Sequence, residues 1–253
     1  SFKRFYLRRA RRIFPALFLV MLVSWPLSYY WLLPEHFEEF SNSLIYVTLF
    51  VSNLFFANKI GYFDSAIDLK PLIHTWSLAV EEQYYLLFPV FLLLFSRRRK
   101  HWLLILGILL SVISFGLAQW EIFGKSLGFY IVLTRVWEFF AGFFVTLYLH
   151  KYPRLKSTTL AGLGMIFLLF PIILLDENVD YPGLYTLYPV LGSVLLILHG
   201  NTGNWIYKVL TNRLIVSIGL MSYSLYLWHQ PVLAYYRYVQ TDVMPQSHRA
   251  LLL

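Results

Sequence analysis

The chain has 253 residues, of which 58% are hydrophobic and only 13% charged, with a formal net charge of +8 and no cysteine. A soluble domain carries roughly 25% charged residues and lacks a succession of long apolar segments, so this composition predicts a protein that crosses a membrane several times. The positive charges cluster between apolar segments, where topology and acidic lipid explain them, so we expect the lipid bilayer and no nucleic acid as a partner. Without cysteine there is no disulfide or thiolate metal site, and no other metal-ligand spacing stands out, so no metal is expected.

Eight apolar segments follow one another along the chain, and we predict that seven of them span the bilayer. A spanning helix needs ~20 apolar residues to cross a hydrocarbon core of about 30 Å. Residues 41–57 are the exception, because serine, threonine and asparagine interrupt them. The predicted spans are residues 14–33, 76–95, 102–120, 129–149, 159–175, 184–198 and 214–235. The predicted fold is therefore an all-α, polytopic transmembrane helix bundle.

The distribution of lysine and arginine predicts the orientation. If residues 41–57 do not cross, the loops on one side hold 15 of these residues and the loops on the other side hold five. If they do cross, the split becomes 11 to nine. Short cytoplasmic loops carry the excess of positive charge. We therefore predict that residue 1 lies on the cytoplasmic side, and that residues 34–75 form an outer excursion in which 41–57 is interfacial or re-entrant.

The basic segment before the first predicted span contains four arginines within five positions: Arg8, Arg9, Arg11 and Arg12. A topology determinant that touches acidic lipid would explain them. The alternative is an anion site, because the guanidinium group binds phosphate in a bidentate manner and keeps its charge. A phosphorylated or nucleotide-containing donor from the cytosol would suit such a site.

At helical spacing His74, Ser77 and Glu81 share one face at the start of the span 76–95. The predicted topology places this face at the outer mouth of the span, well away from the arginines. Ionisable groups at such a depth cost several kcal/mol unless they are paired or face water, so a reaction site is one interpretation. An interfacial belt of aromatic residues with a satisfied histidine is the other.

Two later spans carry further polar groups. Arg135 and Glu138 stand at i, i+3 inside 129–149, as a structural ion pair or a functional one, with Gly142 below them permitting close helix packing. Tyr226 and His229 share one face of the span 214–235. From the residues alone, two functions stay open: a membrane enzyme with a cytosolic anionic donor, or a proton-coupled transporter or flippase.

Four stretches together resemble the acyltransferase 3 family of bacterial integral-membrane O-acyltransferases, which includes O-antigen acetylases. The most specific block combines Gly61-Tyr62-Phe63-Asp64 with the run from His74 to Tyr85. The other blocks are the basic run from Phe5 to Pro15, Thr134 to Gly142, and Ser222 to Pro231. The likeness runs nearly from end to end, with the blocks in family order.

The resemblance implies an enzyme of the bacterial inner, or cytoplasmic, membrane. It would move an acyl group, typically acetyl, from cytosolic acyl-CoA as co-substrate, with no bound cofactor, to a hydroxyl of a cell-surface or lipid-linked glycan. Lipopolysaccharide, exopolysaccharide and peptidoglycan are the expected acceptors. Family members have about ten spans, so we expect residues 1–253 to form one integral-membrane acyltransferase domain that lacks two helices before residue 1 and the last helix.

The resemblance also implies roles for the polar residues. Arg8, Arg9, Arg11 and Arg12 would hold the phosphates of the donor. His74, Glu81 and Glu138 would be catalytic, and the acceptor site or acyl tunnel would be formed by Ser77, Arg135, Tyr226 and His229. The family's first helix carries an arginine and a histidine eleven positions apart, and no residue here corresponds to them. We therefore expect the chain as given to lack the family's main catalytic histidine, and to be inactive by itself.

Overall fold

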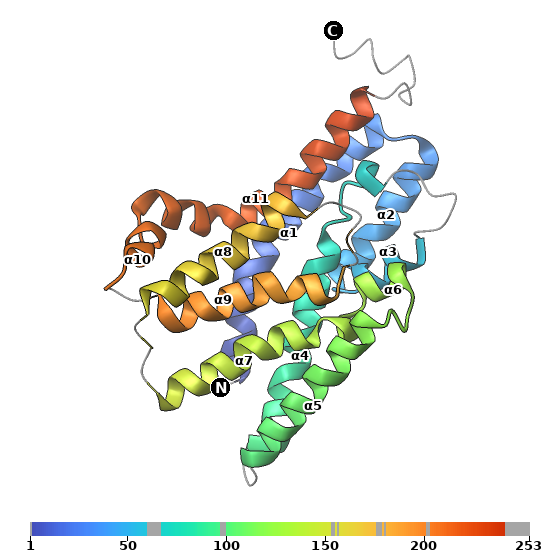
Figure 1. Ribbon diagram of the computed structural model, residues 1–253. Coiled ribbons are helices and arrows are strands. Elements are labelled where there is room, and N and C mark those ends of the chain that lie inside the picture. Colours follow the sequence, from blue (N-terminus) through green and yellow to red (C-terminus); the bar gives the residue numbers. More distant parts are fainter. Residues whose placement is uncertain are drawn as a thin grey trace. The chain divides into compact units, whose positions relative to one another are not determined.

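The computed structural model describes residues 2–59, 67–96, 100–152, 155, 157–175, 179, 181–200 and 203–240. Throughout these residues the secondary structure is helical and no strand occurs, which confirms the all-α prediction. The chain divides into two compact units (Figure 1). The first unit comprises Ser1–Pro89 and Met221–Leu253, and the second comprises Val90–Leu220. Helices α4 (Thr75–Ser96) and α11 (Arg213–Gln240) each contribute to both units.

The first unit is built along α1 (Phe2–Trp31), a helix of 30 residues that is about 45 Å long at 1.5 Å per residue. Near the beginning of α1, the Tyr6 hydroxyl donates to the carbonyl oxygen of Leu86 in α4 at 3.2 Å. The Tyr223 and Tyr235 hydroxyls of α11 donate to the carbonyl oxygens of Ile13 and Ser24, respectively. Helix α11 therefore runs parallel to α1. Figure 1 shows the C-terminal half of α11 beside α1.

Residues 41–57 do not form one continuous helix. Helix α2 (Pro34–Thr48) has 15 residues and α3 (Ser52–Lys59) has eight, so they are about 22 and 12 Å long. Between them Phe50 adopts a left-handed conformation with φ of 54°, and its carbonyl oxygen accepts a hydrogen bond from Gln83 Nε2 at 2.9 Å. A 3₁₀ turn, η1 (Ile67–Leu69), precedes α4. Neither α2 nor α3 is long enough to cross a bilayer core of ~30 Å.

The direction of α4 also argues against a single crossing by residues 41–57. Contacts from Tyr6 to Leu86 and from Arg9 to Glu82 place later residues of α4 beside earlier residues of α1, so the two helices are antiparallel. The chain between them must then cross a bilayer an even number of times or not at all. A single crossing by 41–57 would make α1 and α4 parallel.

The second unit contains eight further elements. They are α5 (Lys100–Gln119), α6 (Lys125–Tyr130), η2 (Val132–Thr134), α7 (Val136–Lys151), α8 (Thr158–Leu174), η3 (Leu184–Thr186), α9 (Leu187–His199) and α10 (Trp205–Leu210). Helix α8 packs along α9, α5 packs along α7, and α7 also contacts α9. The predicted span 129–149 is interrupted, because α6 ends at Tyr130 and α7 begins at Val136.

Helices α8 and α9 approach each other closely at two glycines. A Cβ atom added at Gly164 would lie 2.9 Å from the Gly192 carbonyl oxygen, and one added at Gly192 would lie 2.8 Å from the Gly164 carbonyl oxygen. The backbones of α8 and α9 therefore touch where only glycine fits. The prediction of close packing at Gly142 was wrong, because a Cβ atom there would meet nothing within 4 Å.

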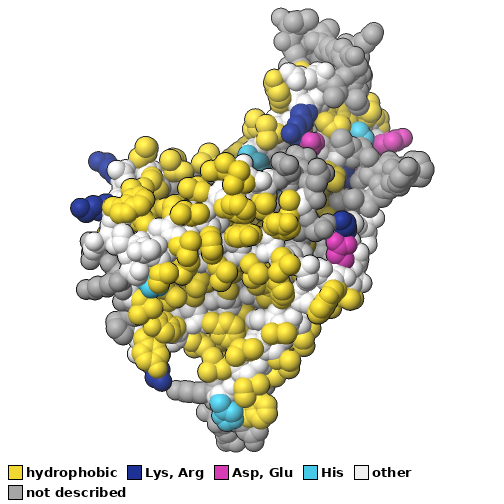
Figure 2. Space-filling view, viewed as in Figure 1, with side chains coloured by type: hydrophobic (Ala, Val, Ile, Leu, Met, Phe, Trp, Pro, Cys, Tyr) yellow, Lys and Arg dark blue, Asp and Glu magenta, His cyan; other side chains and the backbone are white. Residues whose placement is uncertain are grey.

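Much of the described surface is apolar. Hydrophobic side chains cover the face over α7, α8 and α9 in Figure 2. Exposed examples include Ile108 and Val112 of α5 and Ile166 and Ile172 of α8. Within the described ranges, Phe2–Trp31 and His101–Gln119 are long and apolar enough to cross a bilayer, and Thr158–Leu174 and Leu184–His199 are shorter apolar helices. The prediction of seven spans thus stays a prediction.

Candidate functional site

Helices α1 and α4 bring an arginine between two carboxylates. Arg9 Nε and Nη2 donate to Glu82 Oε1 at 3.1 and 2.5 Å, and Nη2 also donates to Glu81 Oε1 at 3.1 Å. The Arg9 guanidinium carbon lies 3.3 Å from the centroid of the Tyr85 ring. We call Arg9, Glu81, Glu82 and Tyr85 the arginine–carboxylate cluster. It contradicts the prediction that the face from His74 to Glu81 lies well away from the arginines.

The two carboxylates differ in exposure. The side chain of Glu82 is 15% exposed and that of Arg9 is 19% exposed, whereas the side chain of Glu81 is 42% exposed. Hydrogen bonds to charged groups strengthen as water is excluded. Glu82 is thus the stronger anchor of Arg9, and Glu81 is the carboxylate that a ligand can reach.

The other cations of the basic segment point elsewhere. Arg4, Arg8 and Arg11 follow one another at i, i+4 and i+7, so they share a face of α1. Together with Lys3 and Leu7 they line an open groove, which we call the basic groove. Arg9 and Arg12 do not line it, although Arg12 is exposed. Of the four arginines predicted to act together, Arg8 and Arg11 line the groove, Arg9 belongs to the arginine–carboxylate cluster, and Arg12 belongs to neither.

A second group of predicted residues meets where α4 begins. The Tyr226 hydroxyl lies 2.6 Å from the His74 carbonyl oxygen, to which it donates, and 2.9 Å from Ser77 Oγ. The His74 ring centroid is 5.0 Å from that of Tyr226 and 5.1 Å from that of His229. The structure therefore brings together four residues predicted from the sequence. We call His74, Ser77, Tyr226 and His229 the histidine cluster.

The imidazole of His74 is buried without a hydrogen bond. Its residue is 8% exposed, and neither ring nitrogen makes a hydrogen bond of normal geometry, although the Leu227 main chain is close enough to act on the ring. Burial, reinforced by neighbouring His229, lowers the pKa of His74 to about 3. A neutral imidazole offers one donor and one acceptor, which suits a ligand hydroxyl. No three histidine or carboxylate side chains gather as metal ligands in the part of the chain that is described.

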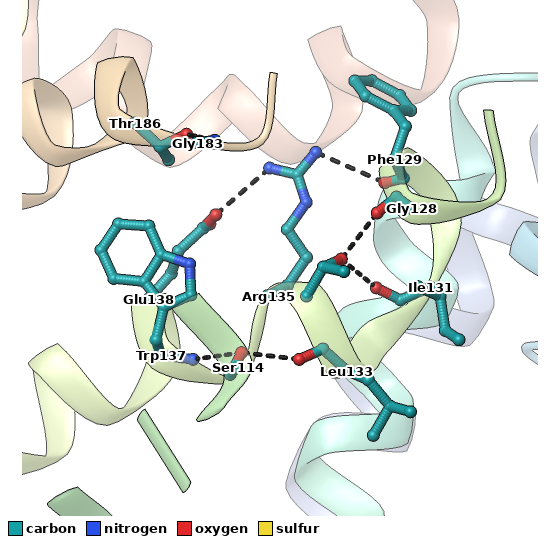
Figure 3. A network of polar contacts seen from close by, with 11 residues as sticks. Ser114, Gly128, Phe129, Ile131, Leu133, Arg135, Trp137, Glu138, Gly183 and Thr186 are labelled. Carbon is teal, nitrogen blue, oxygen red and sulfur yellow. Dashed lines mark hydrogen bonds and ion pairs between the residues drawn. The ribbon is translucent and has the colours of Figure 1, made fainter. Parts of the chain in front are cut away.

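In the second unit, Arg135 and Glu138 form the predicted ion pair (Figure 3). Arg135 Nη1 lies 3.2 Å from Glu138 Oε1, and Nη2 donates to the Phe129 carbonyl oxygen at 3.4 Å. The guanidinium group also lies over the rings of Phe129 and Tyr181, at 5.2 and 5.0 Å from their centroids. Arg135 stands at the N-cap of α7, in the break after η2, and not within a continuous helix as predicted.

Sequence reasoning missed two features of the first unit. Glu82 and Tyr85 were part of the recognised block but were not assigned as the partners of Arg9. Buried Lys70, counted only as a loop charge, pairs with Glu39 at 2.6 Å beside a cavity. The recognised stretch from Gly61 to Asp64 lies outside the described residues.

Comparison with known proteins decides the family. The family profile described as an acyltransferase domain matches residues 1–252. The chain belongs to the acyltransferase 3 family. Similar curated proteins include one of Komagataeibacter xylinus named as a membrane-bound transacylase, which is 28% identical over 90% of this chain. A protein of Staphylococcus aureus named as an O-acetyltransferase is 29% identical over 92% of the chain.

The peptidoglycan O-acetyltransferase OatA of Listeria monocytogenes is also 29% identical, over 99% of this chain. The match covers 58% of the Komagataeibacter protein, 41% of the Staphylococcus protein and 43% of OatA. The chain therefore spans between about two fifths and three fifths of the length of these acyltransferase 3 relatives. No solved structure matches the chain significantly.

Proposed function

We propose that this acyltransferase 3 domain moves an acyl group, in the first instance acetyl, from cytosolic acyl-CoA to a hydroxyl of a cell-surface glycan. The family match over residues 1–252 carries the proposal. Relatives named as O-acetyltransferases support the acetyl group, and OatA supports peptidoglycan as one acceptor beside lipopolysaccharide and exopolysaccharide. The hydroxyl oxygen forms the new ester bond, the carbon–sulfur bond of the thioester breaks, and the hydroxyl proton ends on the CoA sulfur.

The basic groove is the proposed donor site. The phosphates of acyl-CoA are anionic, and the groove presents Lys3, Arg4, Arg8 and Arg11 within the first three turns of α1. Each guanidinium group can bind two oxygens of one phosphate. A face with several arginines therefore suits the phosphates of acyl-CoA better than isolated surface cations would. Arg8 and Arg11 keep the role predicted for them, and Lys3 and Arg4 join them.

We place the domain in the bacterial inner membrane as a multi-pass bundle, with residue 1 and the basic groove on the cytoplasmic side. The excess of positive charge in the predicted inner loops supports this orientation. The antiparallel arrangement of α1 and α4 and the parallel arrangement of α1 and α11 agree with it. Residues 34–75 then form the outer excursion.

The histidine cluster is the proposed binding site for the acceptor hydroxyl. A histidine with so low a pKa is a weak base, so His74 holds and orients the hydroxyl through its free ring nitrogens. Ser77 and Tyr226 fix the main chain at His74. Exposed His229 marks the side from which a ligand reaches the cluster. Arg135 and Glu138 are proposed to line the acyl passage as a buried pair.

The decisive experiment compares the host's surface glycans with and without the complete gene. Loss of the mass increment of an O-acetyl group on deletion, restored by the gene, is the expected result. Unchanged acetylation would overturn the proposal. Unchanged acyl-CoA binding together with lost glycan export, after substitution of Arg8, would favour the transporter instead.

The donor site has its own test in the purified full-length enzyme. Arg8→Gln and Arg11→Gln should each raise the KM for acetyl-CoA about tenfold, because one solvent-screened, charge-assisted contact is worth ~1.4 kcal/mol. Lys208→Gln, which removes an exposed cation of α10, is the matched control and should leave KM unchanged. If all three variants behave alike, the groove is not the donor site.

A further inference from the structure

Arg9 stands apart from the other cations of α1. It faces α4, whereas Arg4, Arg8 and Arg11 line the basic groove. We propose that Arg9 is a positioning residue that holds the carboxylate of Glu81 for the reaction, and that it is not a ligand of the donor's phosphates. This inference rests on the proposed acyl transfer and changes the role that the sequence suggested for Arg9.

Three of the five N–H donors of Arg9 are already engaged. Its Nε and Nη2 make three hydrogen bonds to carboxylate oxygens, and one face of the guanidinium lies on Tyr85. A phosphate bound in a bidentate manner through Nη2 would have to break bonds to the carboxylates, and would weaken the pairing of mostly buried Glu82. Separating such a pair costs far more than a surface arginine would lose on binding the same phosphate. The groove cations can therefore take a phosphate without this cost, and Arg9 cannot.

The contacts of Arg9 are suited to holding the Glu81 carboxylate in place. Glu82 holds the fork through Nε and Nη2, and Tyr85 fixes the plane of the guanidinium. The remaining bond of Nη2 reaches Glu81, whose side chain is more exposed than those of Arg9 and Glu82. Two adjacent carboxylates repel each other, and the planar cation between them offsets that repulsion while setting their separation. Glu81 is thus kept oriented and accessible.

Lysine cannot replace this arrangement. Its ammonium group is a compact charge without a planar face, so it cannot bind both carboxylates in a fixed fork and also stack on Tyr85. Arg9→Lys therefore keeps the charge but loses the orientation. Arg9→Gln loses both.

Kinetics of the full-length enzyme separate positioning from donor binding. Arg9→Gln should lower kcat about 100-fold, since a misplacement of ~1 Å at a reacting group has this effect, and should leave the KM for acetyl-CoA within about twofold. Arg9→Lys should recover only part of kcat. Arg8→Gln should show the opposite pattern, with a raised KM and an unchanged kcat. A raised KM with unchanged kcat in Arg9→Gln would overturn the inference.

A second variant guards against misfolding of Arg9→Gln. Arg9→Gln/Glu82→Gln removes the most buried charge that Arg9 compensates, so it should fold, bind acetyl-CoA normally and keep the low kcat. Recovery of kcat in this double variant would show that Arg9 only balances charge, and would also overturn the inference. If the wild-type enzyme transfers no acyl group at all, the proposed function fails. If the wild type is active and Arg9→Gln binds acetyl-CoA more weakly, only the positioning role of Arg9 is refuted.

Discussion

Replacing Gly192 by alanine tests the contact between α8 and α9. The added Cβ would lie 2.8 Å from the Gly164 carbonyl oxygen and 3.0 Å from the Leu168 backbone nitrogen. Both neighbours are backbone atoms, so no side-chain rotation relieves the contact, and the helices must separate by about half an ångström. Overpacking of this kind costs ~1–3 kcal/mol or more, and alanine returns up to ~1 kcal/mol through its higher helix propensity. We expect a net loss of about 1–2 kcal/mol.

The assay is the thermal unfolding midpoint of the purified protein in detergent. A loss of 1–2 kcal/mol should lower the midpoint by roughly 2–8 °C for a chain of this size. Gly142→Ala is the matched control, because a Cβ atom there meets nothing within 4 Å. It should keep or slightly raise the midpoint, since only the propensity gain operates.

The companion change Gly164→Ala sharpens the test. Its Cβ would meet the Gly192 carbonyl oxygen at 2.9 Å, so one separation of the helices relieves both contacts. The double variant should therefore lose less than the sum of the two single losses. Equal midpoints for Gly192→Ala and Gly142→Ala would refute the close approach of the two backbones.

Three further predictions concern stability. Burial lowers the pKa of His74 to about 3 in the folded protein, from its ordinary value of 6.5. The stability that depends on the neutral ring is therefore fully present above about pH 6.5, and the unfolding free energy should fall by up to ~1.4 kcal/mol per pH unit as pH falls from there towards 3. His74→Gln should flatten this slope. Tyr226→Phe should cost ~1–2 kcal/mol in chemical unfolding, because the hydroxyl bonded to Ser77 and to the His74 carbonyl oxygen is lost. Ser157→Ala should cost ~1 kcal/mol of unfolding free energy, because Ser157 Oγ caps α8 by accepting from Leu160 N. Ser157→Asp should restore most of that stability, and an equal loss in both variants would contradict a capping role.

The lengths of the apolar segments and the positions of lysine and arginine predicted most of the fold. The helical class is confirmed, and a helix occupies at least part of every predicted span. The break at Phe50 was not predicted, although the polar residues in 41–57 and the lysine and arginine counts both indicated that this segment does not cross. The break before Val136 was missed, because nothing in the apolar run 129–149 signals a 3₁₀ turn. A tertiary contact from α5 stabilises it, because Ser114 Oγ donates to the Leu133 carbonyl oxygen at 2.6 Å and accepts from Trp137 N at 3.2 Å.

Prediction of the site succeeded where residues share one helix face or one motif. Spacing along the chain placed Tyr226 and His229 together, and helix α4 brought His74 to them. It failed for Arg9, because only the lateral packing of α1 on α4 decides which arginine of a dense run faces inward. A span boundary drawn at residue 14 also hid the fact that α1 begins at Phe2, so that the basic segment lies beside α4. The register between two helices is a tertiary property that hydropathy does not contain.

The first unit is assembled from both ends of the chain, and this ordering has a consequence for biogenesis. Ser24 and Ser28 of α1 are buried, and the Tyr235 hydroxyl contacts Ser28 Oγ at 2.7 Å. During synthesis α1 is made some 200 residues before Tyr235 exists. Its polar stripe must meanwhile be accommodated by lipid, water or the insertion machinery. Chains that stop within the second unit would leave that stripe uncovered, and so offer membrane quality control a feature by which to recognise them.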